Sequence, residues 1–549
     1  MPTSTRLSRA RAWLIPAVLL LAAGCSRDTG PDGQPAASFT ASSGQVKPVA
    51  TNAVTRYAAA RFADQVSFGA TPALVADIQA KGFERWIDEQ FALPASQLDL
   101  GPISRYDNQI PEQGQFAYRY SNRQLYASML NVPDQLRRRV SWALSQFVVV
   151  SMAKVEPYGG MSYSNLLQKQ AFGNYGELIR AITMNPAMGV YLDNLENRPT
   201  SDECRWCAPN ENYARELMQL FTLGVVKLNL DGSIQRDAAG RPVETYSQKD
   251  VEELARALTG WRMIGSDDRL DYRRYDGELV PDTWRAAHDR GAKVVLGRSF
   301  PAGVEARQEL DTIVSVLMSH QNIAPFVSLR LIQHLVTSDP SPAYIARVAT
   351  VFRNNGQGVA GDMKAVIKAI LLDPEARRGD QPGSDTTTFG KMREPVLWYT
   401  GLLRGLNCKH EMMWDDQYVM SPGSQRPFDA SSVFSFYMPT DRAPGSNLLA
   451  PEQRLLTAEE LSWRFAGFAD AVKRAGADCD AAAFGRAFST SPAAFADLVS
   501  ERFFRGAMPA TLRQNLIDLA PTTWGDTPDQ KAISLLQFAL ATPYYGVIH

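Results

Sequence analysis

Apolar side chains recur three and four residues apart in one segment after another, which is the spacing of one buried helix face. Gly82 and the pair Asn185-Pro186 interrupt this spacing, because glycine and proline disfavour a helix interior. The segments with helical spacing are 71–92, 134–152, 175–197, 209–224, 250–261, four more between 304 and 376, 391–406 and the tail after 450. The sequence therefore predicts a mainly α fold with a large multi-helical body.

Two stretches depart from helical spacing. Residues 225–246 alternate in polarity and contain Asp231-Gly232, which is typical of a hairpin turn. Residues 266–300 are polar and aromatic and end in "AKVVLG", which indicates a second short β excursion. We expect small β-hairpin insertions in the helical body. The loop at about 410–450 is too long for a simple connection and is a candidate lid or wall of a site.

The N-terminus has the pattern of an export signal. Arg6, Arg9 and Arg11 precede the short apolar run "WLIPAVLLLAAGC", so we interpret residues 1–24 as a signal peptide. The ending "LAAGC" resembles a bacterial lipobox, which implies that Cys25 becomes the lipidated first residue of the mature protein. The alternative is an ordinary signal peptide followed by an unrelated cysteine.

The residues after Cys25 are rich in Gly, Pro, Ser and Thr, so residues 25–54 are interpreted as a lipidated cysteine and a flexible tether. The helical body is predicted over 55–549. Ser26 follows the cysteine, and in lipoproteins a residue other than aspartate at this position is typical of the outer membrane. We therefore expect an outer-membrane lipoprotein that is held to the membrane at Cys25 and faces the periplasm or the cell surface.

Charge and cysteine content narrow the function classes. The 57 Lys and Arg nearly balance the 58 Asp and Glu, which argues against a nucleic-acid-binding protein. Disulfides are expected for Cys204, Cys207, Cys408 and Cys479, because thiols outside the cytoplasm tend to oxidise. Free thiols, or a redox motif or half zinc site at "CRWC", remain alternatives, and the sequence does not fix the pairing.

The stretch "PNENYARELMQLFTLG", residues 209–224, places several polar residues at the start of a predicted half-buried helix. Asn210 suits the N-cap, and Glu211 with Arg215 forms an ion pair one turn apart. Asn212 and Glu216 lie on a neighbouring stripe. In the structural interpretation these residues are only the cap and the solvated face of a helix.

The next predicted helix begins with a capping box at Ser247 and Asp250 and contains Arg256 between apolar neighbours. An enclosed guanidinium requires a counter-ion, and we expect Glu216 or Glu211 to supply it. An intermediate interpretation is therefore a buried Arg–Glu network that joins the two helices.

The functional interpretation adds "HDRGAKVVLG". In this interpretation His288 is a candidate for proton transfer because histidine is a common acid–base residue, and Asp289 could orient it or pair with Lys293. With Glu211 or Glu216 nearby, His288 and Asp289 would form an acid–base site for a sugar or an ester. Trp261 and Trp284 are candidates for a wall on which a glycan stacks, although isolated tryptophans more often pack in a core.

The segments "NENYARELMQLFTLGV", "YSQKDVEELARALTGW" and "HDRGAKVVLG", within residues 209–297, resemble the signature of the bacterial domain-of-unknown-function 1800 family. The resemblance covers about 55–549 and implies an exported protein without an established activity. It also implies a possible exported partner with an alkaline-phosphatase-like fold.

Motifs for phosphate loops, nucleophile elbows, zinc proteases and dinucleotide sites are absent from the sequence, so no metal and no cofactor is expected. The expected function is a binding or assembly protein of the envelope that works with an exported partner in the handling of an envelope polymer. The alternative is a metal-independent hydrolase or lyase acting on glycans through Glu211, Glu216, His288 and Asp289.

Overall fold

The computed structural model divides the chain into two units, Met1–Asn52 and Ala53–His549. It describes residues 54–104, 110–202, 204–264, 275, 277–282, 288–384, 388–408, 424–474 and 479–548. The predicted signal peptide, Cys25 and most of the tether lie outside the described residues, as do Trp284 and 409–423.

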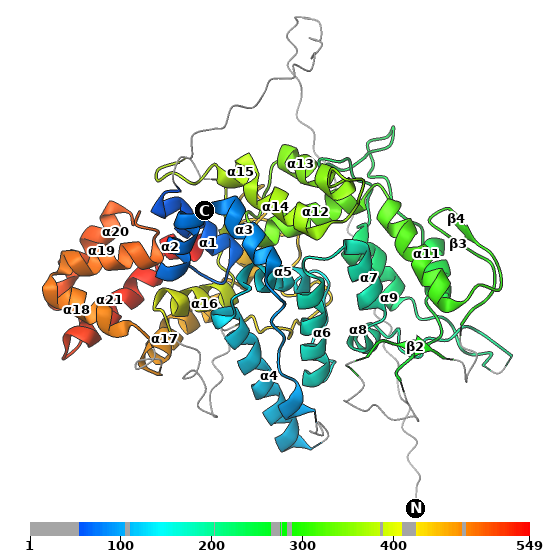
Figure 1. The fold of residues 1–549 in the computed structure, drawn as a ribbon, viewed down its shortest axis with the longest axis horizontal. Coiled ribbons are helices and arrows are strands. Elements are labelled where there is room, and N and C mark those ends of the chain that lie inside the picture. Colours follow the sequence, from blue (N-terminus) through cyan, green and yellow to red (C-terminus); the bar gives the residue numbers. More distant parts are fainter. Residues whose placement is uncertain are drawn as a thin grey trace, which may run out of the picture. The chain divides into compact units, whose positions relative to one another are not determined.

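The described body is mainly helical, which confirms the predicted fold class (Figure 1). The first half contains α1 (Arg56–Val66), α2 (Pro72–Lys81), α3 (Phe83–Ala92), η1 (Gly101–Ile103), α4 (Pro111–Asn131), α5 (Gln135–Ser145), α6 (Pro157–Gln170), α7 (Tyr175–Thr183), α8 (Pro186–Tyr191), α9 (Asn212–Glu216), η2 (Leu217–Thr222) and α10 (Gln248–Ala257). The second half contains α11 (Ala306–Ser319), α12 (Ile323–Leu335), α13 (Pro342–Arg353), α14 (Met363–Leu372), α15 (Pro374–Arg377), α16 (Pro395–Gly405), η5 (Pro451–Leu455), α17 (Ala458–Arg474), α18 (Ala481–Thr490), α19 (Pro492–Phe503), α20 (Ala510–Leu519), η6 (Ala520–Thr522), α21 (Pro528–Leu540) and α22 (Pro543–Gly546).

The strands form three two-stranded antiparallel sheets among the described residues. The pairs are β1 (Trp261–Arg262) with β2 (Val280–Pro281), β3 (Lys293–Val295) with β4 (Arg298–Phe300), and β5 (Lys391–Met392) with β6 (Val547–Ile548). Antiparallel bridges such as Val226 to Glu244 and Leu228 to Ile234 confirm the predicted hairpin in 225–246. Sheet β3–β4 confirms the second predicted β excursion.

Local capping signals set several helix boundaries as predicted. Thr71 Oγ1 accepts a hydrogen bond from the Leu74 amide at the start of α2. Gly82, with φ 77°, ends α2 and begins α3, and this positive φ favours glycine. The Asn185 side chain accepts from the Ala187 and Met188 amides and restarts the chain as α8.

Two predicted helices are shorter than expected. The helix predicted over 134–152 ends at Ser145, before a run of three β-branched valines that disfavour helix continuation. The helix predicted to reach residue 197 ends at Tyr191. Asp193 and Glu196, with φ of 58° and 56°, turn the chain into the left-handed region, where a helix cannot continue.

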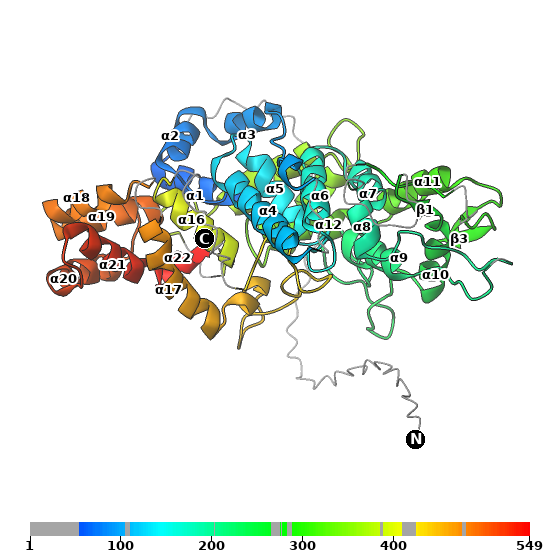
Figure 2. The ribbon, with the colours of Figure 1, turned by 90° about the horizontal axis from the view of Figure 1, so that it is seen from below.

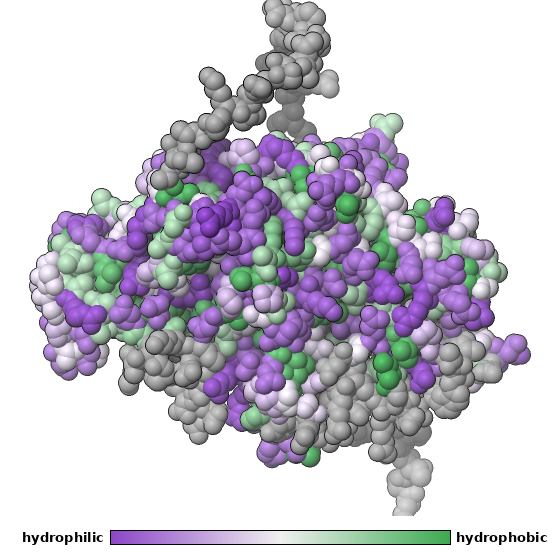
Figure 3. Space-filling view, viewed as in Figure 1, coloured by the Kyte–Doolittle hydropathy of each residue, from purple (hydrophilic) through white to green (hydrophobic). Residues whose placement is uncertain are grey.

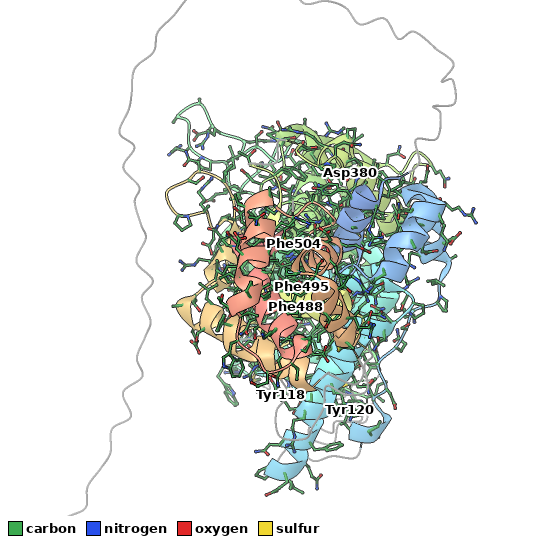
Figure 4. The ribbon with its side chains drawn as sticks, turned by 90° about the vertical axis from the view of Figure 1, so that its left-hand side faces the viewer. Tyr118, Tyr120, Asp380, Phe488, Phe495 and Phe504 are labelled. Atoms are coloured by element: carbon green, nitrogen blue, oxygen red, sulfur yellow. A yellow bond between two sulfur atoms is a disulfide. The ribbon has the colours of Figure 1, made fainter. Side chains whose placement is uncertain are left out.

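Two hydrophobic clusters fill the described body. The larger includes buried residues of α5, α6, α7, α10 and α12. The smaller gathers at α16 and α18–α21 (yellow to red in Figure 1), where the rings of Phe488 and Phe495 meet edge to face at 5.8 Å (Figure 4). None of the described helices is both long enough and apolar enough to cross a membrane. On the face in Figure 3, hydrophobic residues appear as separate small groups among hydrophilic ones.

All four cysteines of the body form disulfides, which confirms the favoured prediction. Cys204 pairs with Cys207, and Cys408 pairs with Cys479 in the smaller cluster. Residues 424–450 of the predicted long loop contain no helix. This segment packs on the end of α5, where the Ser151 hydroxyl donates to the Ala430 carbonyl at 2.7 Å.

Candidate functional site

The signature helix changes its winding halfway. Residues Asn212–Glu216 are α-helical, whereas Leu217–Thr222 form the π-helical segment η2, so the predicted regular α-helix to Phe221 is wrong in its second half. The Leu223 amide donates to the Met218 carbonyl at 2.8 Å, and Gly224, with φ 73°, ends the segment as predicted. Such π-helical turns are rare and frequently accompany functional sites.

Polar groups at the start of α9 face α10 across the surface. The predicted pair forms, with Arg215 Nη2 2.7 Å from Glu211 Oε2. Gln248 connects it to α10, donating to Glu211 at 2.9 Å and accepting from Arg215 at 3.1 Å. Asn210 Oδ1 accepts from the Asn212 amide at 2.9 Å, one residue before the structural N-cap. Helices α9 and α10 lie side by side in Figure 2.

The counter-ions of Arg256 differ from those predicted. Its guanidinium donates to both carboxylate oxygens of Asp289, at 2.7 and 3.1 Å, and its Nη1 contacts Glu253 at 3.0 Å. The prediction that Glu216 or Glu211 neutralises Arg256 is therefore wrong. Glu253 lies one turn away on the same helix, and the loop that contains Asp289 packs on α10. Both carboxylates therefore lie within hydrogen-bonding distance of the Arg256 guanidinium. These bonds lower the pKa of Asp289 despite its partial burial, which opposes that change.

A fully buried ion pair, Lys293 with Glu309, lies beside the partly buried Arg256–Asp289 pair. Lys293 Nζ is 2.9 Å from Glu309 Oε1, and both side chains are fully buried. His288 Nδ1 lies 3.0 Å from the Thr259 carbonyl oxygen, while its Nε2 lies 3.5 Å from Glu309 Oε2. Glu309, on α11, was missed by the sequence prediction. Its signal was an acid beside Leu310, within the apolar helical stripe of α11.

The candidate catalytic residues separate into two groups. Among the described residues, no hydrogen bond or ion pair joins Glu211 or Glu216 to His288 or Asp289. Glu216 is only 7% exposed, burial raises its pKa, and its Oε2 has no hydrogen-bond partner. The described residues therefore show no direct contact between the two glutamates and the His288–Asp289 pair of the predicted acid–base site.

Trp261 does not line an accessible wall. It is fully buried in the larger cluster, with the Arg307 guanidinium 5.9 Å from its ring centroid. The interpretation of this tryptophan as a stacking surface for a glycan is wrong, because strand β1 turns the indole into the core. Its backbone has a structural role: the Trp261 carbonyl accepts from the Glu196 amide at 2.8 Å.

An open groove of about 630 Å³ lies at the other end of the signature. It is lined by Lys154, Gly189, Val190, Asp193, Leu195, Glu196, Asn197, Arg198, Cys207, Ala208 and Asn210. Asn212 Nδ2 donates to Asp193 Oδ2 at 3.1 Å, which ties the first residue of α9 to this groove. The volume is typical of ligand sites, which span about 300–1,000 Å³.

Reciprocal amide bonds fix one side of the groove. The Asn210 amide donates to Asn197 Oδ1 at 2.7 Å, and Asn197 Nδ2 donates to the Asn210 carbonyl at 3.1 Å. The segment between them contains the Cys204–Cys207 disulfide. Asn210, near the start of the signature, therefore fixes one side of the groove, whereas the sequence indicated only a helix cap at this residue.

The family model "Protein of unknown function (DUF1800)" matches residues 61–547. The chain belongs to this family. Comparison with curated proteins and with solved structures gives no match. The match spans all three segments of the family signature, from the groove at Asn210 through α10 to strand β3.

The arrangement suits binding more directly than proton transfer. The charges of Arg256, Asp289, Lys293 and Glu309 are neutralised by one another. The polar groups of the groove, in contrast, are partly open to solvent. Among the described residues, no group of His, Cys, Asp and Glu is placed to hold a metal ion.

Proposed function

We propose that this protein is an exported envelope lipoprotein that binds and assembles other envelope components rather than transforming a substrate. One observation carries the proposal: both carboxylate oxygens of Asp289 accept from Arg256, and His288 faces the buried Glu309 in a cluster that contains neither signature glutamate. A general acid or base needs a path to substrate, and this cluster is occupied by its own ion pairs. The open groove beside Asn210 supplies a binding surface.

The membrane attachment is part of the proposal. The apolar run before Cys25 and the Gly- and Ser-rich residues after it support a lipid anchor with a flexible tether. Ser26 supports retention in the outer membrane. A long tether would let the body reach other envelope components.

The proposed partner is an exported protein with an alkaline-phosphatase-like fold, as membership of the family implies. The role best supported is to hold such a partner close to an envelope polymer. The body contributes a groove, and the anchor contributes position at the membrane.

A metal-independent hydrolase or lyase acting on envelope glycans is the second candidate. It is favoured by Glu216, whose raised pKa and unpartnered oxygen are typical of a general acid. In this candidate Glu216 would act without His288, since no contact joins them in the described part of the chain.

The full chain and its Glu216→Gln, His288→Ala and Cys25→Ser variants separate these functions. Each is expressed in an exporting bacterial host, fractionated, and incubated with envelope polysaccharides, whose products are analysed by mass spectrometry. We expect no cleavage by the unchanged chain, and membrane association that Cys25→Ser abolishes. Cleavage that Glu216→Gln or His288→Ala removes, with unchanged circular dichroism, would establish the enzyme instead. Membrane association that persists in Cys25→Ser would refute the anchor.

A further inference from the structure

We propose that the groove between Asp193 and Asn210 binds a neutral oligosaccharide segment of an envelope polymer. This inference rests on the proposed function, because it assumes that the ligand is held and not cleaved. It is carried by the lining chemistry of the groove, by the fixed backbone at two of its acids, and by the exposed indole of Trp206, which is next in sequence to the lining residue Cys207.

The lining of the groove mixes polar and apolar surface and has no net charge. Lys154 and Arg198 supply two cations, and Asp193 and Glu196 supply two anions. They are partly matched within the groove, with Lys154 Nζ bonded to Asp193 and Arg198 3.9 Å from Glu196. A polyanionic ligand would gain little from this balance, whereas a neutral ligand with many hydroxyl groups finds donors and acceptors side by side.

Two acids of the groove are held in position by the main chain. Asp193 and Glu196 both have left-handed backbone conformations, which side-chain-bearing residues rarely adopt. Hydrogen bonds hold this turn: the Asn194 and Leu195 amides donate to the Gly189 carbonyl at 2.9 and 3.0 Å. Between the two acids, Asn194 is 2% exposed and its Nδ2 has no hydrogen-bond partner. Because the backbone of this turn is already fixed, it does not have to be ordered when a ligand binds.

An exposed aromatic residue, Trp206, is next in sequence to a residue that lines the groove. Cys207 lines the groove, and its disulfide to Cys204 closes a short loop that contains Trp206. Trp206 is 85% exposed, and the Thr200 hydroxyl donates to the Cys207 carbonyl at 2.6 Å. An indole has a large flat apolar face, on which the CH groups of a sugar ring pack while the hydroxyls reach polar side chains.

The groove is poorly suited to two other ligand classes. A divalent cation requires carboxylate oxygens that are free to coordinate, but the two oxygens of Asp193 accept from Lys154 and Asn212. An apolar peptide helix requires a continuous hydrophobic stripe, whereas charged and amide side chains interrupt the apolar lining residues Gly189, Val190, Leu195 and Ala208. A neutral saccharide uses both the paired polar groups and the exposed indole.

Titration calorimetry on the full chain in detergent tests the inference. The probes are hexasaccharides of β-1,4-glucose, α-1,4-glucose and β-1,4-N-acetylglucosamine, with hexagalacturonate as the anionic comparison. We expect saturable binding of at least one neutral hexasaccharide and none of hexagalacturonate. Trp206→Ala should weaken this binding at least tenfold, and Asn197→Ala should weaken it as well. Trp524→Ala is the matched control, since Trp524 is 83% exposed but neither it nor its neighbours in sequence line the groove, and the variant should bind unchanged.

The outcomes separate this inference from the proposed function. Absence of binding by every neutral probe, binding of hexagalacturonate alone, or equal affinity in Trp206→Ala would each overturn the saccharide site. The same samples are analysed for shortened products after titration. Binding with cleavage would leave the ligand class standing and overturn the non-catalytic function. Binding without cleavage, lost in Trp206→Ala and kept in Trp524→Ala, supports both.

Discussion

Replacing Glu309 with leucine is expected to lower the free energy of unfolding by about 3–5 kcal/mol. Glu309 is the carboxylate nearest to Lys293 Nζ, at 2.9 Å, and neither side chain is exposed. The variant leaves a buried ammonium with only the carbonyls of Asp289 and Gly291 and a more distant Asp289 carboxylate. Chemical denaturation followed by circular dichroism measures the effect.

The double variant Lys293→Met/Glu309→Leu is the control for this buried pair. Because it removes both charges, we expect it to recover much of the lost stability. Glu211→Ala provides a second comparison, since its pair with Arg215 is about one-third exposed and should contribute no more than about 0.5 kcal/mol. A loss below about 1 kcal/mol in Glu309→Leu would show that the Lys293–Glu309 pair does not stabilise the body.

Acidification from pH 6.5 to pH 4.5 is expected to destabilise the protein by about 2–3 kcal/mol through His334. Burial, helped by the nearby charge of Lys391, lowers the pKa of His334 from 6.5 to about 3. The unfolded chain therefore binds a proton at a pH where the folded chain does not. The stabilising contribution is complete above pH 6.5 and is lost as the pH falls toward 3.

Denaturation midpoints measured across this range test the contribution of His334. His334→Asn should flatten the curve between pH 6.5 and pH 4.5. Below pH 4.5 both proteins should lose stability through Glu394. Burial alone would raise the pKa of Glu394, but the charge of Lys391 and the hydrogen bond from Gln425 outweigh it and lower the pKa from 4.5 to about 2. An acid limb of equal slope in wild type and His334→Asn would contradict the assignment.

Features that depend on neighbouring residues could be predicted from the sequence. The cap at Thr71, the break at Gly82 and the capping box of Ser247 with Asp250 all form as expected. Each depends on a few consecutive residues and on one or two backbone hydrogen bonds. The family signature also consists of contiguous segments, so it could be recognised in the sequence, and the family match over 61–547 confirms it.

Features that depend on distant segments could not be predicted in this way. The charge on Arg256 correctly indicated a counter-ion, but the polar residues at 209–224 favoured Glu216 or Glu211 over Asp289, because nothing in the sequence shows which segment approaches α10. Glu309 was not associated with His288, because that contact depends on how α11 packs and not on a local pattern. The left-handed residues Asp193 and Glu196 gave no local sequence signal, because neither is glycine.

We conclude that charges of the signature bond to one another to join α10 to the loop at residues 288–293, with Asp289 and not Glu216 as the bonded partner of Arg256. A double-mutant cycle tests it most directly, using Arg256→Met with Asp289→Asn and, in parallel, Arg256→Met with Glu216→Gln. We expect a coupling energy of about 1–3 kcal/mol for Arg256 with Asp289, and none beyond about 0.5 kcal/mol for Arg256 with Glu216. Coupling to Glu216 without coupling to Asp289 would contradict the account.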